Sequence, residues 1–420
     1  MAFYNTIIIG AGAAGLMAAT SAAQKGSVLI IEKMEKAARK VRITGKGRCN
    51  ITNTKDKDEF LDKLRSGAEF FERAFDYFDN KATMAFFENN GLELEIERGA
   101  RVFPKSGKAW DVADTLVKAA KDAGARIEYY CSAQSINAVD GKIKSVTTTD
   151  GFEISCNNVI ICTGGLSYPL TGSTGDGYNM AYDLGHDIEP VRPSLTPLES
   201  DDVMIKKLSG TKLKNINTKL LIDGEAKAEE FGEMEFMPFG VSGAIILRMS
   251  RFAVDAIIDN RKVEISIDLK PALSVQQLIN RIEREVKTMR PTEQITELVH
   301  RLTPSRLVSP VLHQARIPIL LHIRQFDQQR REALISTLKD LRLNISDYRP
   351  YAEAIVTAGG VDLNQVDPNT LESRIVEGLF FAGEVLDIDA NTGGYNLQVA
   401  FSTGRLAGAS VKLSKRKWGY

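Results

Sequence analysis

The chain has 420 residues, with 54 Lys and Arg against 54 Asp and Glu, so its formal net charge is zero. This balance excludes a basic surface over the whole chain, although it leaves room for a local basic patch. The sequence contains no run of 18 apolar residues, so no membrane span is predicted. Its four cysteines include no Cys-x-x-Cys pair, which indicates reduced thiols and a cytoplasmic protein.

The first 32 residues predict a strand, a helix and a second strand. An apolar run ends at Gly10, an alanine-rich helix follows Gly12 and Gly15, and a second apolar run ends at Glu32. At this spacing the first glycine permits a tight turn, the second lets a pyrophosphate approach the backbone, and the third lets helix and strand pack closely. The helix N-terminus attracts phosphate, and Glu32 suits an adenosine ribose. The unit predicts a dinucleotide site.

Between this unit and residue 191 the pattern predicts one loop, several helices and further strands. The loop is basic and has poor periodicity, so we expect an ordered loop near the cofactor. Two Asp-Gly pairs predict hairpin turns. In chain order the predicted elements are the loop 33–54, helices within 57–90 and 109–123, a parallel strand 127–130, hairpin turns at Asp140-Gly141 and Asp150-Gly151, and a strand 159–161.

The strand–helix rhythm stops near Pro190 and returns after Tyr351. Because the N-terminal unit alone cannot complete a doubly wound sheet, the segment between them is interpreted as an insertion. We therefore predict an α/β fold with a split cofactor domain, residues 1–191 and 351–420, and an inserted substrate domain, residues 192–350. The elements expected after residue 192 are strands 218–222 and 262–269, helices 275–288 and 326–342, a strand 378–383 and a small-residue helix 397–412.

The late segment from Phe381 to Gln398 favours FAD over NAD. Gly383 and Glu384 follow a strand end, where a carboxylate suits ribityl hydroxyls. Three residues open the final helix, and its N–H groups and dipole are expected to stabilise negative charge at the flavin N1–C2=O edge. These three residues are Asn396, Leu397 and Gln398. The alternative interpretation is a glycine-rich loop without a ligand.

Several separated strings carry a family resemblance. They are Ile8–Gly15 with Glu32-Lys33, Thr44–Asn53, Val102–Pro104 with Ser106 and Lys108, Cys162–Pro169, Thr171–Gly177, Phe239–Gly243 and Thr357–Gln398. Together they resemble the BaiN/RdsA family of NAD(P)/FAD-dependent oxidoreductases over the whole chain. That family includes bile-acid enone reductases, aminoacetone oxidase-like enzymes and a bacterial ribosomal-RNA dihydrouridine synthase.

The resemblance implies an FAD-binding Rossmann-like domain, an inserted β-barrel-like portion and a small helical portion. The cofactor residues it implies are Gly10, Gly12, Ala14 and Gly15 at the pyrophosphate turn, Glu32 with Lys33 at the ribose, Arg48, Cys49 and Asn50 beside the flavin, Ala133 at the adenine, and Thr163 and Gly164 under the nucleotide. The chain departs from its relatives at Met237-Pro238 and Ala244, where they commonly carry Thr-His and Pro. This chain therefore has no counterpart of the relatives' histidine, and no role of that residue is expected here.

Flavin would supply hydride chemistry, and the protein would supply position and protons. Cys49 is the first candidate acid, because Arg48 and nearby lysines are expected to lower the pKa of its thiol. Its alternative role is a small buried filler or a backbone contact to FAD. Tyr168 is a second candidate donor, with packing against the core or cofactor as its alternative role. Arg48 itself is a candidate for an anionic phosphate or the flavin O2 edge, or a solvated loop arginine.

The sequence leaves three classes of function open. The first is an NADH- or NADPH-driven reductase of a conjugated C=C bond, in a small enone or in uridine of ribosomal RNA. The RNA substrate gains support from residues 281–345, which hold 12 Lys and Arg against 7 Asp and Glu. The second class is an oxidase of an amine or amino-ketone that releases peroxide, and the third is a non-catalytic flavin-bearing RNA factor. The four histidines lack metal-ligand spacing, so no metal is expected.

Overall fold

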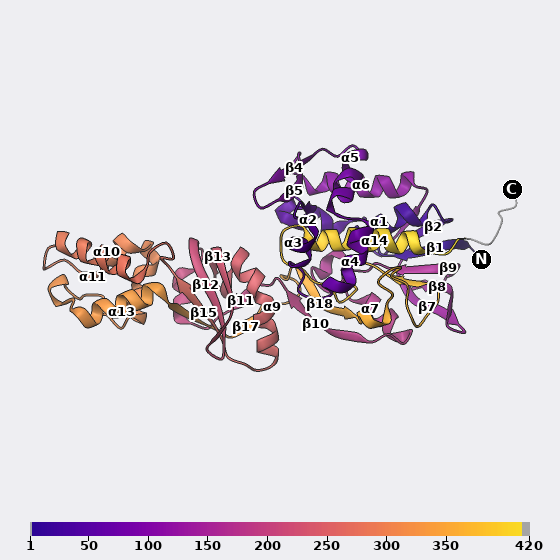
Figure 1. Cartoon of the computed structure of the whole chain (residues 1–420). Coiled ribbons are helices and arrows are strands. Elements are labelled where there is room, and N and C mark those ends of the chain that lie inside the picture. Colours follow the sequence, from indigo (N-terminus) through magenta and orange to yellow (C-terminus); the bar gives the residue numbers. More distant parts are fainter. Residues whose placement is uncertain (1, 414–420) are drawn as a thin grey trace. The chain divides into compact units, whose positions relative to one another are not determined.

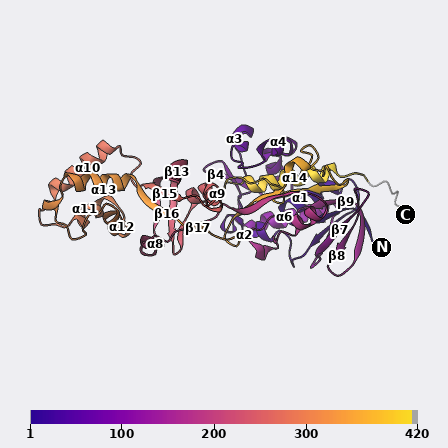
Figure 2. The same cartoon turned by 90° about the horizontal axis from the view of Figure 1, so that it is seen from below.

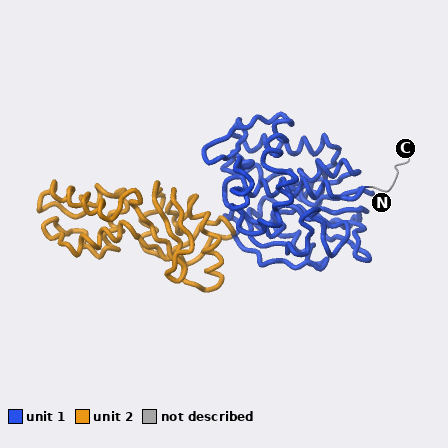
Figure 3. Tube along the Cα trace, in the orientation of Figure 1, with its two compact units in different colours: residues 1–193, 351–420 blue, residues 194–350 orange. Residues whose placement is uncertain are grey.

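The computed structural model describes residues 2–413, and the chain divides into two compact units (Figure 3). Unit 1 joins residues 1–193 to residues 351–420, and unit 2 is the intervening segment 194–350. Each unit has a hydrophobic core of its own. Unit 2 is therefore inserted into unit 1, which is discontinuous in sequence.

Unit 1 is built on a seven-stranded sheet in the order β6-β2-β1-β9-β8-β7, with β19 beside β9 (Figure 1). Its strands are β1 (Phe3–Ile9), β2 (Val28–Glu32), β6 (Arg126–Tyr129), β7 (Ala133–Val139), β8 (Lys142–Thr148), β9 (Glu153–Ile161) and β19 (Leu379–Phe381). The strands β6, β2, β1, β9 and β19 pair in parallel, whereas β7 and β8 form antiparallel hairpins. Ile7, Ile8, Ile160 and Ile161 are fully buried, as expected for parallel strands covered on both faces. The predicted α/β fold is confirmed.

Helices α1 (Ala13–Ala22) and α14 (Tyr395–Ser410) lie side by side in unit 1, as Figures 1 and 2 both show. Their contact is close because small residues face one another. A Cβ at Gly404 would stand 2.4 Å from the Ala14 carbonyl oxygen, and one at Gly408 would stand 2.1 Å from that of Ala18. The last helix of the described chain is thereby packed against the first.

The remaining elements of unit 1 surround this sheet. They are α2 (Arg39–Gly47), α3 (Lys57–Leu61), α4 (Ala68–Tyr77), α5 (Asn80–Asn89), α6 (Ala109–Asp122), α7 (Asp176–Asp183), the 3-10 turns η1 (Pro169–Thr171) and η4 (Leu363–Gln365), a three-stranded sheet β3 (Thr52–Asn53), β5 (Arg101–Pro104) and β4 (Leu94–Glu97), and a two-stranded sheet β10 (Ile188–Ser194) and β18 (Val356–Val361). The predicted helices within 57–90 and 109–123 are confirmed.

The segment 33–54, expected as a loop, contains the short helix α2. Regular helix ends at Thr44, whose ψ is 151°, and Gly45 and Lys46 follow with φ of 57°. Lys46 and Cys49 share this left-handed conformation, which is uncommon for residues other than glycine. Because the helix is short and a left-handed turn follows it, the segment shows no apolar periodicity. The sequence therefore does not predict this helix.

Unit 2 contains a seven-stranded antiparallel sheet in the order β16-β15-β12-β13-β14-β11-β17. Its strands are β11 (Leu198–Glu199), β12 (Lys212–Ile222), β13 (Glu225–Met237), β14 (Gly240–Ser242), β15 (Val263–Asp268), β16 (Leu341–Ile345) and β17 (Asp347–Tyr348). The strands at the two ends of this order, β16 and β17, are separated in sequence by Ser346 alone. The sheet therefore curls until its ends meet at that residue, which accounts for the barrel-like expectation.

The helical portion of unit 2 lies between β15 and β16 in sequence. It consists of α10 (Val275–Thr288), α11 (Ile295–Leu302), η2 (Ser305–Leu307), α12 (Val308–Gln314), η3 (Ile323–Gln325) and α13 (Gln328–Lys339), while α8 (Val203–Leu208) and α9 (Ala244–Ile258) belong with the sheet. A capping box between Ser274 and Gln277 begins α10 at the predicted residue. Within residues 2–413, no helix has both the length and the apolar character needed to cross a bilayer.

His186 is a buried histidine with a defined hydrogen-bond pattern, between α7 and β10. Its Nδ1 lies 3.1 Å from the Ala181 carbonyl oxygen, so this nitrogen carries the proton. Its Nε2 then accepts from the Ser373 hydroxyl at 2.7 Å, and that hydroxyl oxygen accepts the N–H groups of Ile375 and Val376. Burial lowers the pKa of His186 below its ordinary value of 6.5.

This burial predicts acid sensitivity in unit 1. The unfolded chain takes up the His186 proton first as the pH falls below about 6.5, so the free energy of unfolding should fall from that pH down to the lowered folded pKa. We expect urea denaturation between pH 7.5 and 4.5 to show a shallower pH dependence for His186→Gln than for the unaltered protein. Parallel curves for the two proteins would contradict this assignment.

Candidate functional site

The glycine turn between β1 and α1 has a different geometry at each glycine. Gly10 has φ of +101°, and a Cβ there would meet the Cys162 carbonyl oxygen at 2.7 Å. A Cβ at Gly15 would lie 2.0 Å from the Gly10 oxygen, so no side chain fits there. At Gly12, by contrast, no atom lies within 4 Å of the added Cβ. The turn is closed against protein at two glycines and open at the third, where a ligand could approach.

Glu32 ends β2 beside this turn, and its carboxylate is held in one orientation. Its two oxygens accept the backbone N–H groups of Ala11 and Met34, each at 2.9 Å. Burial nevertheless raises the pKa of Glu32, because desolvation outweighs these hydrogen bonds. Each carboxylate oxygen has a further lone pair, so a hydroxyl-bearing ligand can still bind.

Lys33 points its ammonium group toward the start of α7. It forms an ion pair with Asp176 at 2.6 Å and also contacts Thr174. The side chain of this expected cofactor residue is therefore engaged with protein.

Three other expected residues lie beside the turn. Thr163 and Gly164 follow β9, and a Cβ at Gly10 would come within 3.2 Å of the Thr163 Cα. Ala133 begins β7, two residues after Cys131, whose N–H donates to the Glu32 carbonyl oxygen at 3.0 Å. The structure thus brings these backbones together at the carboxyl ends of β1, β2 and β9.

Cys49 is fully buried, and its environment differs from the expected one. Burial raises the pKa of its thiol to about 12, and the hydrogen bond with Thr44 only partly opposes this. The prediction that Arg48 lowers this pKa is wrong, because the Arg48 guanidinium turns away to Glu97 and lies 4.4 Å from the ring centre of Phe103. At neutral pH Cys49 is a thiol and not a thiolate.

These environments predict an order of thiol reactivity. Burial raises the pKa of all four thiols, but Cys49, Cys156 and Cys162 are buried, whereas Cys131 is only half-buried and accessible to a reagent. Since the thiolate is the reactive form, native protein at pH 8 should react with Ellman's reagent at Cys131 first. Cys131→Ser should abolish the early phase, and denaturant should expose the other three. An early phase that disappears in Cys49→Ser instead would contradict the burial of Cys49.

The side chain of Asn50 contains a buried hydrogen-bond acceptor that is not paired within the described chain. Its side-chain oxygen is buried and has no hydrogen-bond partner among the described residues. A buried unpaired acceptor costs about 1–3 kcal/mol, so a donor from a ligand beside Cys49 would be stabilised here. A ring N–H of a bound ligand would satisfy it.

The three residues expected at the start of the last helix have separate roles. Asn396 fixes the preceding loop by bonding both the N–H and the carbonyl of Ala390. Gln398 is fully buried between the Phe78 carbonyl and the Thr52 hydroxyl, and its N–H already donates to Gly394. Because α14 starts at Tyr395, the free N–H groups of its first turn are those of residues 395–397, including Asn396 and Leu397. Gln398 therefore supports the helix end, and its backbone N–H, already bonded to Gly394, is not available to a ligand.

Glu384 lies at the centre of a network that the sequence analysis missed. Its carboxylate accepts from the Thr357 N–H at 2.7 Å and the Ser167 hydroxyl at 2.9 Å, and pairs with the Lys40 ammonium at 2.7 Å. These partners come from three distant segments. The only signals in the sequence are the basic character of residues 33–54 and the Thr357–Gly360 string. Gly383, just before, has φ of +79° and lies against Ala14.

Tyr168 follows Ser167 and has a left-handed backbone with φ of 54°. Its N–H donates to the Tyr351 carbonyl at 3.0 Å. The side chain is half-buried, and within residues 2–413 its hydroxyl has no hydrogen-bond partner. The phenol is therefore available as a proton donor, one residue after the Ser167 of the Glu384 network.

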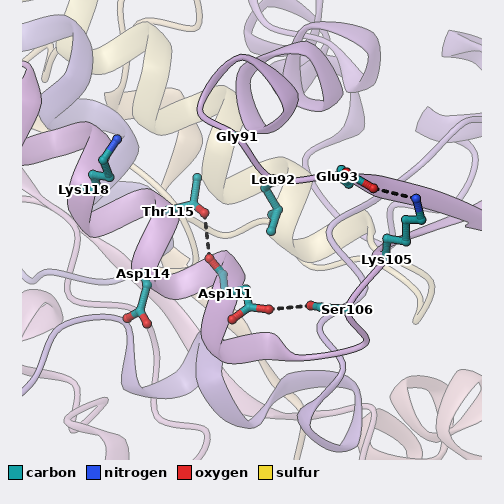
Figure 4. A pocket seen from close by; sticks show the side chains of 9 residues that line it. All are labelled: Gly91, Leu92, Glu93, Lys105, Ser106, Asp111, Asp114, Thr115 and Lys118. Atoms are coloured by element: carbon teal, nitrogen blue, oxygen red, sulfur yellow. Dashed lines mark hydrogen bonds and ion pairs between the residues drawn. The ribbon is translucent and has the colours of Figure 1, made fainter.

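A separate surface pocket of about 550 Å³ lies beside α6 (Figure 4). The Glu93–Lys105 ion pair and the Ser106–Asp111 hydrogen bond lie along it. It contains none of the expected cofactor residues. Its lining consists of Gly91, Leu92, Glu93, Lys105, Ser106, Asp111, Asp114, Thr115 and Lys118. Within the described chain, no three His, Cys, Asp or Glu side chains gather as a metal site.

Comparisons with known proteins identify the family of this chain. The family model described as HI0933-like protein Rossmann domain matches residues 4–410. A 3-dehydro-bile acid Δ(4,6)-reductase of Clostridium scindens is 30% identical over 411 residues, covering 96% of this chain and 98% of the relative. A ribosomal RNA dihydrouridine synthase of Escherichia coli is 28% identical, covering 95% of this chain and 96% of the relative.

The fold also resembles that of a solved dehydrogenase. The crystal structure of a 3-ketosteroid Δ1-dehydrogenase from Sterolibacterium denitrificans matches with a TM-score of 0.54, covering 97% of this chain and 99% of that one, at 12% identity. This likeness shows the fold alone. The match of the family model over nearly the whole chain shows that the protein belongs to the HI0933-like Rossmann family, a family of FAD-dependent oxidoreductases.

Proposed function

We propose that this chain binds FAD and uses NADH or NADPH to reduce a C=C bond conjugated to a carbonyl group. One observation carries the proposal: the glycine turn is open only at Gly12, beside the fixed carboxylate of Glu32, at the carboxyl ends of parallel strands. In open α/β sheets, ligands bind outside the carboxyl ends of the strands.

The residues present fit FAD at each part of that cofactor. The turn at Gly12 and the N-terminus of α1 would hold the pyrophosphate, and Glu32 would hold the ribose. Asn50 would accept from a ring N–H, and the free N–H groups at the start of α14 would face developing negative charge. FAD, once bound, supplies hydride chemistry.

The chain's own groups would supply the protons and the orientation. Tyr168 is the more accessible donor, because its hydroxyl has no hydrogen-bond partner among residues 2–413 while the Cys49 thiol is fully buried. Cys49 would then serve as a small buried filler that lets the backbone of residues 48–50 contact FAD. Since the sequence has no second G-x-G-x-x-G turn, the nicotinamide reductant would bind transiently.

The names of the two relatives describe the same kind of chemistry, and this chemistry supports the proposed class of substrate. One name describes a reductase of a bile acid and the other the synthesis of dihydrouridine in ribosomal RNA, and both describe saturation of a C=C bond. The basic segment 281–345 gives limited support to RNA, because half of its 12 cations form ion pairs. The paired cations are Arg290, Arg301, Arg330, Arg331, Lys339 and Arg342.

Four cations of this segment remain available for phosphate contacts. Six of the twelve have no carboxylate partner among the described residues, and two of these, Arg281 and Arg306, donate to backbone carbonyls instead. The other four are Arg284, Lys287, Arg316 and Arg324. A site with four phosphate contacts would lose affinity moderately with salt, with a log–log slope of about −3 to −4.

The test is a set of turnover assays on the purified, FAD-loaded protein. Oxidation of NADH or NADPH is followed with a steroid enone, with ribosomal RNA from a strain lacking dihydrouridine synthase, and with no substrate. Consumption coupled to either substrate supports the proposal, and mass spectrometry of the RNA separates the two. Peroxide release from an amine without nicotinamide would overturn the reductase in favour of an oxidase. A flavin that no reductant bleaches would overturn both.

A further inference from the structure

Lys40 lies in the Glu384 network and has no role in the proposed function so far. Its ammonium donates to the Glu384 carboxylate at 2.7 Å and to the Ser167 hydroxyl at 3.2 Å. An ammonium group has three donors, and the third has no protein partner among the described residues. The Lys40 and Glu384 side chains keep only 23% and 20% of their exposure. This pair is therefore more desolvated than an ordinary surface ion pair.

Several contacts place this network beside the glycine turn. The Ala38 N–H, at the start of α2, donates to the Ala11 carbonyl oxygen at 2.8 Å. On the opposite side, a Cβ at Gly383 would stand 2.8 Å from the Ala14 Cβ. Lys40 and Glu384 each follow one of these contacts within two residues. The ion pair is thus fixed at the same sheet edge as the predicted cofactor site.

Two further hydrogen bonds make the network rigid. The Thr357 hydroxyl oxygen accepts the N–H groups of Leu166 and Ser167, at 2.8 and 3.1 Å, and the Thr357 N–H donates to Glu384. The segment after β9, the strand β18 and the segment after β19 are thereby joined. Lys40 connects α2 directly to Ser167 and Glu384, and only through them to Thr357.

We propose, on the basis of the FAD-dependent function above, that Lys40 is a positioning residue for FAD. It holds the Glu384 carboxylate in place and offsets its negative charge beside the bound flavin. An uncompensated carboxylate at this site would repel the pyrophosphate and oppose the addition of electrons to the ring. A compact ammonium suits this task, because it reaches Glu384 and Ser167 together and keeps one donor for the ligand.

The test compares FAD affinity and flavin midpoint potential in Lys40→Met, Lys40→Arg and the matched control Lys36→Met. Lys36 is an exposed lysine of the same segment, and its ammonium lies over the Trp110 ring. We expect Lys40→Met to raise the Kd for FAD about tenfold. Reduced flavin should lose a further tenfold relative to oxidised flavin, which lowers a two-electron potential by about 30 mV. Lys40→Arg should restore most of the FAD affinity and of the midpoint potential, and Lys36→Met should change neither quantity.

The outcomes separate this proposal from the function on which it rests. Unaltered protein that binds no FAD overturns the proposed function. Unaltered protein that binds FAD, with a Lys40→Met variant indistinguishable from Lys36→Met, overturns the role of Lys40 alone. If circular dichroism shows that Lys40→Met does not fold, Lys40→Met/Glu384→Gln is compared with Glu384→Gln. A lower potential in the double variant supports the proposal, and an equal potential overturns it.

Discussion

Gly12→Ala should fold like the unaltered protein and bind FAD poorly. The added methyl group meets no atom within 4 Å, and Gly12 has φ of −81°, which alanine adopts freely. Alanine is a weaker N-cap than glycine, so the free energy of unfolding should fall by less than about 1 kcal/mol. The methyl would instead occupy the space of the pyrophosphate. Overpacking of roughly 1–3 kcal/mol corresponds to a Kd about 5- to 150-fold higher.

Gly15→Ala is the matched variant with the opposite result. Its Cβ would lie 2.0 Å from the Gly10 oxygen, a backbone atom that cannot rotate away. We expect a loss of about 3 kcal/mol or more of unfolding free energy. Urea denaturation of the FAD-free proteins and fluorescence titration with FAD measure the two effects separately. Equal FAD affinity of Gly12→Ala and unaltered protein would remove the pyrophosphate from this turn.

Gly408→Ala in α14 should destabilise unit 1, against the trend of helix propensity. Propensity alone would make this change stabilising by about 1 kcal/mol. The new Cβ, however, would stand 2.1 Å from the Ala18 carbonyl oxygen and 2.5 Å from the Ser21 hydroxyl oxygen. We expect a net loss of about 2 kcal/mol, and hence a melting temperature lower by roughly 4–8 °C.

The neighbouring residue provides the control for this change. Ala409 is half-buried in the same helix, and Ala409→Leu adds more volume than Gly408→Ala. We expect its melting temperature to stay within about 2 °C of the unaltered value, since substitutions at partly exposed positions have small effects on stability. A melting temperature of Gly408→Ala at or above the unaltered value would show that α1 and α14 can separate without cost.

The elements predicted best are those with strong local signals. The unit from β1 to β2 and the bounds of α10 match the structure, because glycine spacing and a capping box are read within a few residues. Strand β13 was missed, since its Glu- and Ala-rich sequence lacks β-branched residues. Its signal was Asp223-Gly224, where φ values of 52° and 88° form the tight turn from β12.

The site was predicted only in part, for a related reason. The glycine turn and Glu32 are contiguous in one unit and could be read from spacing. The environments of Arg48 and Cys49 depend on β4 and β5, some 50 residues away, so the expected effect of Arg48 on the thiol could not be checked. The Lys40, Ser167, Thr357 and Glu384 network joins four segments, and no local pattern announces it.

The insertion of unit 2 has a consequence for how the protein is made. Ribosomes deliver residues in order, so all of segment 194–350 leaves the exit tunnel before α14 exists. Unit 2 is continuous in sequence and can finish folding during translation. The face of α1 that carries Ala14 and Ala18, by contrast, stays exposed until α14 has been synthesised. In a nascent chain arrested before residue 395, we therefore expect unit 2 to resist protease, and unit 1 to be incompletely folded and unable to retain flavin.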